Sequence, residues 1–208
     1  MTEYFIGTSG WHYEDWKGLF YPNDLPRSRW LEFYSRYFPT VELNNSFYRL
    51  PSEKAFTNWR ESVGDGFIFA VKASRFITHV KRLKDTEEPL HNFIQRANFL
   101  GGKLGPVLYQ LPPNMKRNDD RLIAFLKVLP DSYRHVMEFR HESWFDEAVF
   151  QNLRNCGAGW CIFDMPDLTS PVVATADFAY VRFHGNVSLY SSSYSDKQLA
   201  DWAKKISA

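Results

Sequence analysis

The stretch FIFAVKASRFITHVKRLKDTEEPLHNFIQRANFLGGKLGPVLYQ, residues 67–110, contains the pattern that decides the fold. It begins with the short apolar run Phe67–Ala73 and ends with a second run, Pro106–Gln110. Between the two runs, apolar residues recur at helical spacing, namely Leu90, Phe93, Ile94 and Ala97. Such residues form one apolar face of a helix. A strand, a helix and a second strand in this order predict two parallel strands joined by a crossover helix.

The same alternation of strand and helix continues along the whole chain. Seven short runs are predicted to be strands: Tyr4–Ser9, Thr40–Asn44, Phe67–Ala73, Pro106–Gln110, Arg134–Phe139, Gly159–Asp164 and Phe178–His184. Helical spacing of apolar residues also predicts helices around Trp30–Tyr37 and Leu122–Leu129. Ser195 and Gln198 match a capping box, which predicts a C-terminal helix. Residues 165–177 contain two prolines and are expected to be irregular.

Parallel strands with helical crossovers favour either an open doubly wound sheet or a closed barrel. The predicted strand ends are 20 to 38 residues apart, close to the ~31 residues per unit of an eightfold barrel. The glycine motifs of dinucleotide-binding folds and of P-loop proteins are absent from the sequence, which weakens those alternatives. We therefore expect an α/β fold of the TIM-type (β/α) barrel, with seven βα units visible and the eighth missing or truncated.

Composition and charge exclude several classes of protein. The 208 residues are 44% hydrophobic and carry 25 basic and 24 acidic side chains, which excludes disorder and disfavours a general polyanion binder. This length can bury one large core, so a single domain over residues 1–208 is expected. The sequence contains neither a signal peptide nor a membrane span, and we expect a cytoplasmic protein that binds no membrane. Cys156 and Cys161 are expected to be buried and reduced.

Polar side chains stand at the ends of most predicted strands, where barrel enzymes have their active sites. Since side chains alternate along a strand, three pairs each share a face: Glu42 with Asn44, Glu138 with Arg140, and Arg182 with His184. The candidate catalytic residues are Glu42, Lys72, Glu138, Asp164 and His184. We expect the carboxylates to serve as general acid and base, and the cationic residues to hold an anionic or oxygen-rich group.

Other side chains that follow strand ends are candidates for binding a substrate: Trp11, Asn44, Tyr48, Gln110, Arg140, His141, Trp144 and Arg182. The leading hypothesis is an enzyme of unassigned reaction that acts on a small oxygen-rich or phosphorylated molecule. Two other interpretations stay open. The charged residues could form satisfied ion pairs that fill the end of the barrel, or the carboxylates and His184 could hold a divalent metal, although no typical ligand spacing singles out a pair.

A different class of function is a non-catalytic protein that binds nucleic acid or a protein partner. Its best support is the basic run after the third strand, which consists of Lys72, Arg75, Lys81, Arg82 and Lys84. The alternative interpretation of this run is a solvated loop, because acidic residues follow it at once.

Six sequence motifs together resemble one family, the YecE-like proteins, also called domain of unknown function 72. They are GTSGWHYEDWKGLFYP at Gly7–Pro22, FPTVELNNSFYRLP at Phe38–Pro51, FIFAVKASRFITH at Phe67–His79, LGPVLYQLPP at Leu104–Pro113, EFRHESW at Glu138–Trp144 and YVRFHG at Tyr180–Gly185. The motifs span most of the chain, and as a set they are highly specific. The resemblance implies a barrel of the triosephosphate-isomerase type with these motifs at one mouth, and it implies no established reaction, substrate or cofactor.

The resemblance also implies a set of signature residues: Gly10, Trp11, Glu42, Asn44, Phe47, Tyr48, Lys72, Arg75, His79, Gln110, Pro112, Glu138, Arg140, His141, Trp144, Asp164, Arg182, His184 and Gly185. Among them, Arg75 joins the residues expected to bind the substrate. Similar proteins continue into an eighth strand and a last helix, whereas this sequence ends at Ala208. Since open sheet edges pair readily with other strands, a homo-oligomer through the open edge of the barrel is a further expectation.

Overall fold

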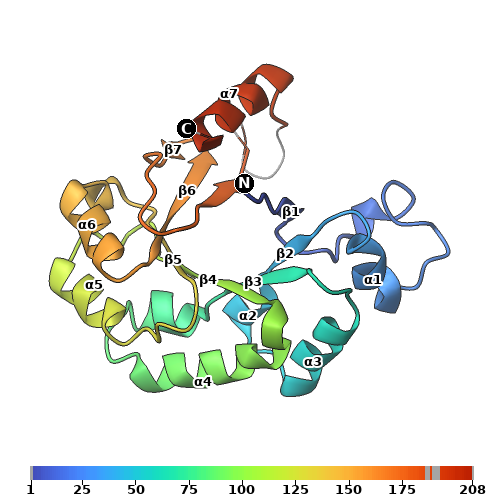
Figure 1. Ribbon diagram of the computed structural model, residues 1–208, viewed down its shortest axis with the longest axis horizontal. Helices are drawn as coiled ribbons and strands as arrows, with labels where there is room; N and C mark the ends of the chain where they lie inside the picture. Colours follow the sequence, from blue (N-terminus) through green and yellow to red (C-terminus); the bar gives the residue numbers. More distant parts are fainter. Residues whose placement is uncertain (1, 186–187, 189–192, 208) are drawn as a thin grey trace. The chain divides into compact units, whose positions relative to one another are not determined.

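A computed structural model of the chain describes residues 2–185, 188 and 193–207. Its internal contacts group the residues into two compact units. The first unit contains Met1–Leu108 and Asp131–Tyr133, and the second contains Tyr109–Pro130 and Arg134–Ala208. In Figure 1 the first unit is mostly blue to green and the second mostly yellow to red. A single domain over the whole chain stays a prediction.

The first unit contains parallel strands paired in chain order. The strands are β1 (Gly7–Thr8), β2 (Thr40–Leu43), β3 (Ile68–Lys72) and the first part of β4 (Leu104–Gln110). In register, Thr8 pairs with Val41 and Val41 pairs with Phe69. The helices are α1 (Trp30–Tyr34), α2 (Asn45–Tyr48), α3 (Glu53–Glu61) and α4 (Glu87–Ala97), and α3 contacts α4 (Figure 1).

The backbones of β1 and β2 approach each other closely, and Gly7 and Tyr34 account for this approach. A Cβ atom on Gly7 would fall on the carbonyl oxygen of Thr40, so only glycine fits this approach of the two backbones. The buried Tyr34 hydroxyl accepts a hydrogen bond from the Thr8 amide at 2.9 Å and donates one to the Thr40 carbonyl at 3.0 Å. Helix α1 thus fixes the end of the short strand β1.

Replacing Tyr34 with Phe is expected to lower the free energy of unfolding by about 1–2 kcal/mol, because the Thr8 amide and the Thr40 carbonyl lose a buried partner. The measurement is urea denaturation. The matched control is Tyr37→Phe, at a side chain that is 62% exposed. Equal denaturation midpoints for the two variants would show that the Tyr34 hydroxyl does not fix β1.

The second unit continues the parallel pattern. Strand β4 ends in it, and β5 (His135–Glu138), β6 (Gly159–Met165) and β8 (Tyr180–Phe183) follow, with β6 pairing in parallel with both β5 and β8. Strand β7 (Leu168–Thr169) turns back and pairs with β6 in the antiparallel sense. The helices are α5 (Asp119–Leu126), α6 (Glu147–Asn155) and α7 (Asp196–Ser207).

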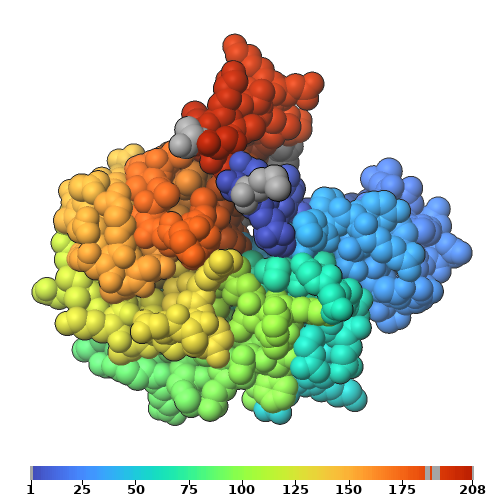
Figure 2. All heavy atoms as spheres, in the orientation of Figure 1, coloured from blue at the N-terminus to red at the C-terminus, as the bar shows by residue number. Residues whose placement is uncertain are grey.

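Helix α7 begins with the capping box that the sequence predicts. The Ser195 amide donates to Gln198 Oε1 at 2.8 Å, and the Gln198 amide lies 3.4 Å from Ser195 Oγ. The ring of Trp202 packs on Phe183 of β8 with 5.2 Å between centroids. Figure 2 shows this helix in red beside the orange strands of the same unit.

All seven predicted strands are present, and their parallel pairing within each unit confirms an α/β fold. The first is much shorter than predicted, because Tyr4, Phe5 and Ile6 are exposed and only Gly7 and Thr8 pair with β2. Residues 165–177, all of them described, contain the short strand β7 and no helix, as expected. Both cysteines are free, but only Cys161 is buried, so the expectation for Cys156 at the end of α6 was wrong.

Among the described residues, no helix has both the length and the apolar character that crossing a membrane requires.

Candidate functional site

The strongest concentration of charge in the second unit surrounds the side chain of Glu138. This residue ends β5 and is fully buried. Arg140 Nε donates to its Oε1 atom at 2.5 Å, and Arg182 Nη1 donates to its Oε2 atom at 2.6 Å. Each carboxylate oxygen is therefore matched to a different arginine.

His184 completes this group, which we call the Glu138 cluster: Glu138, Arg140, Arg182 and His184. His184 Nε2 lies 3.1 Å from an Nη2 donor of Arg140. Because a guanidinium group can only donate, this contact requires an unprotonated Nε2 atom. Arg182 and His184 are two residues apart and are both buried, in agreement with the face that alternation along β8 predicts for them.

The charges of the cluster determine its chemistry. Burial opposes ionisation of Glu138, but the positive charges of Arg182 and Arg140 outweigh burial and lower the pKa of this carboxyl to about 2. The carboxylate is thus ionised at neutral pH, and it faces two guanidinium groups. Arg140 uses its Nε for Glu138 and its Nη2 for His184, so its guanidinium group keeps further N–H donors that suit an anionic or oxygen-rich ligand. A carboxyl with this pKa is a poor general acid near neutrality, so the geometry favours a positioning role for Glu138.

Asp164 at the end of β6 has different neighbours. Its Oδ1 atom accepts a hydrogen bond from Thr169 Oγ1 of β7 at 2.6 Å. Burial, together with the adjacent Asp164 carboxylate, raises the pKa of Tyr194 to about 12. Cys161, three positions earlier on β6, instead places its Sγ atom 3.9 Å from Glu138 Oε2. Alternation along β6 therefore directs Asp164 away from the face that contacts Glu138, and its catalytic role stays a prediction.

Three further candidates lie in the second unit. The contacts of two of them, Trp144 and His141, indicate structural roles. Trp144 is completely buried, and its indole Nε1 atom donates to the Met115 carbonyl at 2.7 Å, so it is a core residue and no direct contact with a ligand is expected. His141 Nδ1 accepts from the Ser143 amide at 3.1 Å and caps the short helix Glu142–Trp144. Gln110 is buried at the end of β4.

In the first unit, the structure joins Glu42 and Asn44 through a serine. Ser9 Oγ donates to Glu42 Oε1 at 2.9 Å, and Asn44 Nδ2 donates to Ser9 Oγ at 2.5 Å. Glu42 is buried at the end of β2. The shared face that alternation predicts for Glu42 and Asn44 agrees with these contacts, and Ser9 is the residue that sequence reasoning did not include.

The end of β3 adds an aromatic and cationic group in the same unit. Lys72 Nζ lies 4.3 Å from the centroid of the Phe47 ring, and His79 meets the same ring edge to face at 5.0 Å. Ser46 Oγ donates to the Lys72 carbonyl at 2.7 Å and ties α2 to β3. Tyr48 is 75% exposed, so it is available for contact with a ligand.

The basic segment after β3 has an unusual backbone. A π-helix at Phe76–Val80 follows the exposed Arg75, and the non-glycine residues Arg82, Leu83 and Asp85 have positive φ angles of 49°, 66° and 49°. Lys84 is exposed, whereas Lys81 and Arg82 are half-buried. The cations do not all face solvent, and binding of nucleic acid or protein by this segment stays a prediction.

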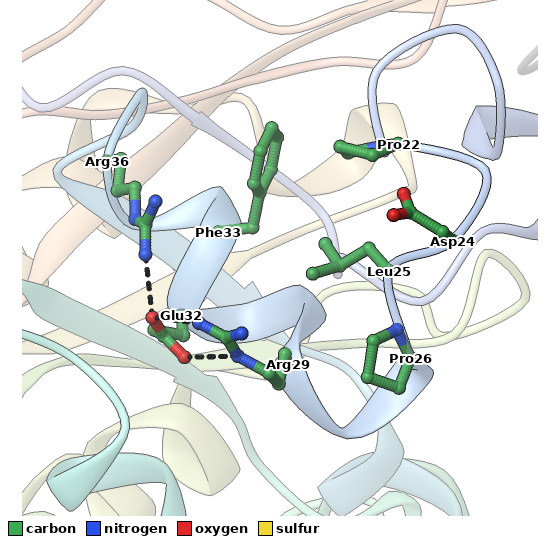
Figure 3. A pocket seen from close by; sticks show the side chains of 8 residues that line it. All are labelled: Pro22, Asp24, Leu25, Pro26, Arg29, Glu32, Phe33 and Arg36. Carbon is green, nitrogen blue, oxygen red and sulfur yellow. Dashed lines mark hydrogen bonds and ion pairs between the residues drawn. The ribbon is translucent and has the colours of Figure 1, made fainter.

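The first unit contains at least two cavities lined by described residues. One, of about 340 Å³, is shown in Figure 3, where Glu32 stands between Arg29 and Arg36 beside apolar residues such as Phe33 and Leu25. Hydrogen bonds from Arg29 and Arg36 lower the pKa of the Glu32 carboxyl to about 2, so its charged groups already satisfy one another. The other cavity, of about 500 Å³, includes the predicted ligand-binding residue Trp11 among its lining residues.

Metal binding gains no support from the part of the chain that the structure describes. Within it, no three His, Cys, Asp or Glu side chains come together in a way that could hold a metal ion. Glu138, the metal-ligand candidate with the most contacts, is engaged by two arginines instead.

Two residues that connect the candidates, Ser9 and Phe47, were not among the predicted catalytic or binding residues, although Phe47 is one of the signature residues. Ser9 directly follows Thr8, which pairs with Val41, so Ser9 lies near the end of β2. Its position at the polar end of a predicted strand is the sequence signal that could have identified it. Phe47 lies on the short helix α2, and no periodic pattern in the sequence predicts its position between Lys72 and His79.

Parallel strands, helical crossovers and charged side chains at the carboxyl ends of the strands define an α/β protein with a polar strand-end site. The chain belongs to the DUF72 family, since the model described as "Protein of unknown function DUF72" matches residues 5–208. This match confirms the resemblance that the sequence motifs indicate.

The named relatives carry no functional description. UPF0759 protein YecE of Escherichia coli K12 is 29% identical over 154 residues, which are 74% of this chain and 54% of YecE, so the matched part spans about half of that relative. UPF0759 protein YunF of Bacillus subtilis is 26% identical, with 97% of this chain and 82% of YunF covered.

Solved structures of the family are similar as well. A DUF72 family protein from Thermotoga maritima has a TM-score of 0.85 and 33% identity, covering 98% of this chain and 86% of that one. A DUF72 family protein from Enterococcus faecalis has a TM-score of 0.70 at 18% identity, covering 84% of this chain and 79% of that one, and it supports the fold alone.

Proposed function

We propose that this protein is an enzyme that binds a small oxygen-rich or phosphorylated molecule at the carboxyl ends of its strands, with the Glu138 cluster as the anion-binding part. The observation that carries the proposal is the partly exposed guanidinium group of Arg140, which the buried Glu138 holds through Nε and which keeps further N–H donors for a ligand. Charge-assisted hydrogen bonds from these donors would hold an anionic ligand more strongly than a neutral one.

The roles of the residues follow from their contacts. Glu138 positions both guanidinium groups and fixes their planes. The Arg140 side chain is 15% exposed and that of Arg182 is 8% exposed, so Arg140 is the arginine that reaches a ligand. His184, in contact with Arg140, is the nearest group able to accept or release a proton.

The proposal includes the TIM-type (β/α) barrel that the sequence predicts, with its eighth unit missing or truncated. Parallel pairing within each unit and the likeness to the Thermotoga maritima structure support it. In such barrels the active site lies at the carboxyl ends of the strands, and Glu42, Asn44 and Lys72 stand at strand ends of the first unit.

Replacing Arg140 with Lys is expected to weaken binding of glycerol 3-phosphate at least about tenfold, because a lysine cannot contact Glu138 and a phosphate with a planar fork of donors. Isothermal titration calorimetry with inorganic phosphate and glycerol 3-phosphate measures the change. The matched control is Arg154→Lys on α6, whose arginine pairs with the exposed Glu147.

Two results would contradict the proposal. One is equal affinity of the wild type and Arg140→Lys for both probes. The other is an absence of heat in the wild type up to about 10 mM of either probe, beyond the range of a weak specific site. Urea denaturation of each variant separates a loss of binding from a loss of folding.

A further inference from the structure

None of the candidate catalytic residues lines the cavity of about 500 Å³ in the first unit. Its lining residues include Trp11 and His12 after β1, Leu31 of α1, and Asn58, Trp59 and Glu61 of α3. The volume is within the range of small-molecule sites, roughly 300–1,000 Å³. Three separate segments of one unit therefore line an open depression of suitable size.

Aromatic rings form a corner in this cavity. The rings of Trp11 and Trp59 meet edge to face, with 5.7 Å between centroids and 84° between planes. The His12 ring lies 5.2 Å from Trp11 and 5.6 Å from Trp30. An aromatic face carries negative potential and attracts the slightly positive hydrogens of C–H groups.

The corner is held in place before any ligand arrives. The buried Tyr21 hydroxyl donates to the Trp11 carbonyl at 2.7 Å, and the Tyr21 ring stacks on Trp30 at 4.5 Å. On the other side, Phe56 of α3 is fully buried and packs edge to face on Trp59 at 5.3 Å. A rigid wall binds a ligand with little loss of side-chain entropy.

The polar groups around the corner are mixed, and their charges are already balanced. Arg27, another lining residue, pairs with Glu14 at 2.7 Å, and Glu61 pairs with Arg60 at 3.3 Å. Asn58 is exposed and offers both a donor and an acceptor. A ligand with strong net charge would find no unbalanced partner here, whereas hydroxyl groups, which donate and accept, match this edge.

We propose that the Trp59 cavity, lined by Trp11, His12, Leu31, Asn58, Trp59 and Glu61, binds a neutral carbohydrate. The C–H face of a sugar ring lies against the half-buried indole of Trp59, which the buried Trp11 supports from one side, and the hydroxyl groups bond to the amide of Asn58 and the carboxylate of Glu61. This site is independent of the Glu138 cluster, which lies in the second unit and is suited to an anion.

The test is a titration of the ¹⁵N-labelled protein with maltose and cellobiose, followed at the indole Nε1–H signal of Trp59. Trp59→Phe assigns this signal. At least one of the two sugars is expected to shift it in a saturable way. Asn58→Ala is expected to weaken the affinity about fivefold, since it removes one hydrogen-bonding group at an exposed position.

Two control variants test whether sugar binding is specific to the Trp59 cavity. Asn92→Ala, at an exposed position on α4, is expected to leave the sugar affinity unchanged. Arg140→Lys is also expected to leave it unchanged, so failure of the proposed anion site and failure of this site are distinguishable. The proposal is overturned if neither sugar shifts the Trp59 signal, if Asn58→Ala binds as tightly as the wild type, or if tetramethylammonium shifts the signal and the sugars do not.

Discussion

Glu138→Gln is expected to lower the free energy of unfolding by about 3 kcal/mol at neutral pH, because it leaves Arg140 and Arg182 without the buried carboxylate that they share. The pKa of this group falls from 4.5 to about 2 on folding, which corresponds to a stabilisation of the same order. Urea denaturation measures the loss. Glu147→Gln is the matched control, since Glu147 forms a 2.5 Å ion pair with Arg154 but its side chain is 74% exposed, and a loss of about 0–1 kcal/mol is expected there.

The pH dependence of the free energy of unfolding of Glu138→Gln tests whether the ionised form of Glu138 stabilises the protein. A carboxyl whose pKa is lowered by folding stabilises the protein above its unfolded pKa and loses that contribution as the pH falls towards its folded pKa. The difference between wild type and Glu138→Gln should therefore be largest above pH 4.5 and shrink between about pH 4.5 and pH 2. A difference that is near zero at neutral pH, or that grows on acidification, would contradict the ion-pair assignment.

Trp144→Ala is expected to lower the free energy of unfolding by about 4 kcal/mol, because it opens a large cavity in the core. It also removes the indole donor from the Met115 carbonyl. The Trp144 ring packs 4.6 Å from Phe139, which in turn stacks on Trp160 at 5.2 Å, so the cavity would lie within an aromatic cluster. Thermal and urea denaturation both measure this loss.

The milder variant Trp144→Phe decides between a core role and a ligand contact. It should remain folded and bind glycerol 3-phosphate within about twofold of the wild type, since a buried side chain contributes nothing to a ligand contact. If Trp144→Phe bound glycerol 3-phosphate about tenfold more weakly with unchanged stability, Trp144 would have to be counted among the ligand-binding residues.

Apolar runs and helical spacing were sufficient to predict the strands and several helices. The runs at residues 67–73 and 106–110 became β3 and β4 because their apolar side chains are buried, as Phe69 and Val107 show. The extent of β1 was not predictable from its own residues, since Tyr4–Ile6 has strong strand propensity but only Gly7 and Thr8 reach a partner. Pairing is a tertiary property that local sequence does not encode.

The candidate site was predictable where alternation along a strand fixes a direction. Glu42 and Asn44 both contact Ser9, and Arg182 and His184 both contact members of the Glu138 cluster, as a shared face for each pair requires. Residues in the loops after strands were less predictable, because an aromatic or imidazole ring there can face a ligand or pack inward. Trp144 packs in the core and His141 caps a short helix, and no spacing pattern separates these outcomes from ligand binding.

The measurement that tests the central claim most directly is the NMR signal of the Arg140 Nε–H group during a titration with glycerol 3-phosphate. This hydrogen lies in the 2.5 Å contact with Glu138, so its signal is sensitive to any anion that engages the guanidinium group. Arg140→Lys assigns the signal by removing it. The account predicts a saturable shift of this signal with the same affinity as the calorimetric titration. A signal that stays fixed while the phosphate binds elsewhere would show that the Glu138 cluster is a structural ion pair and not an anion site.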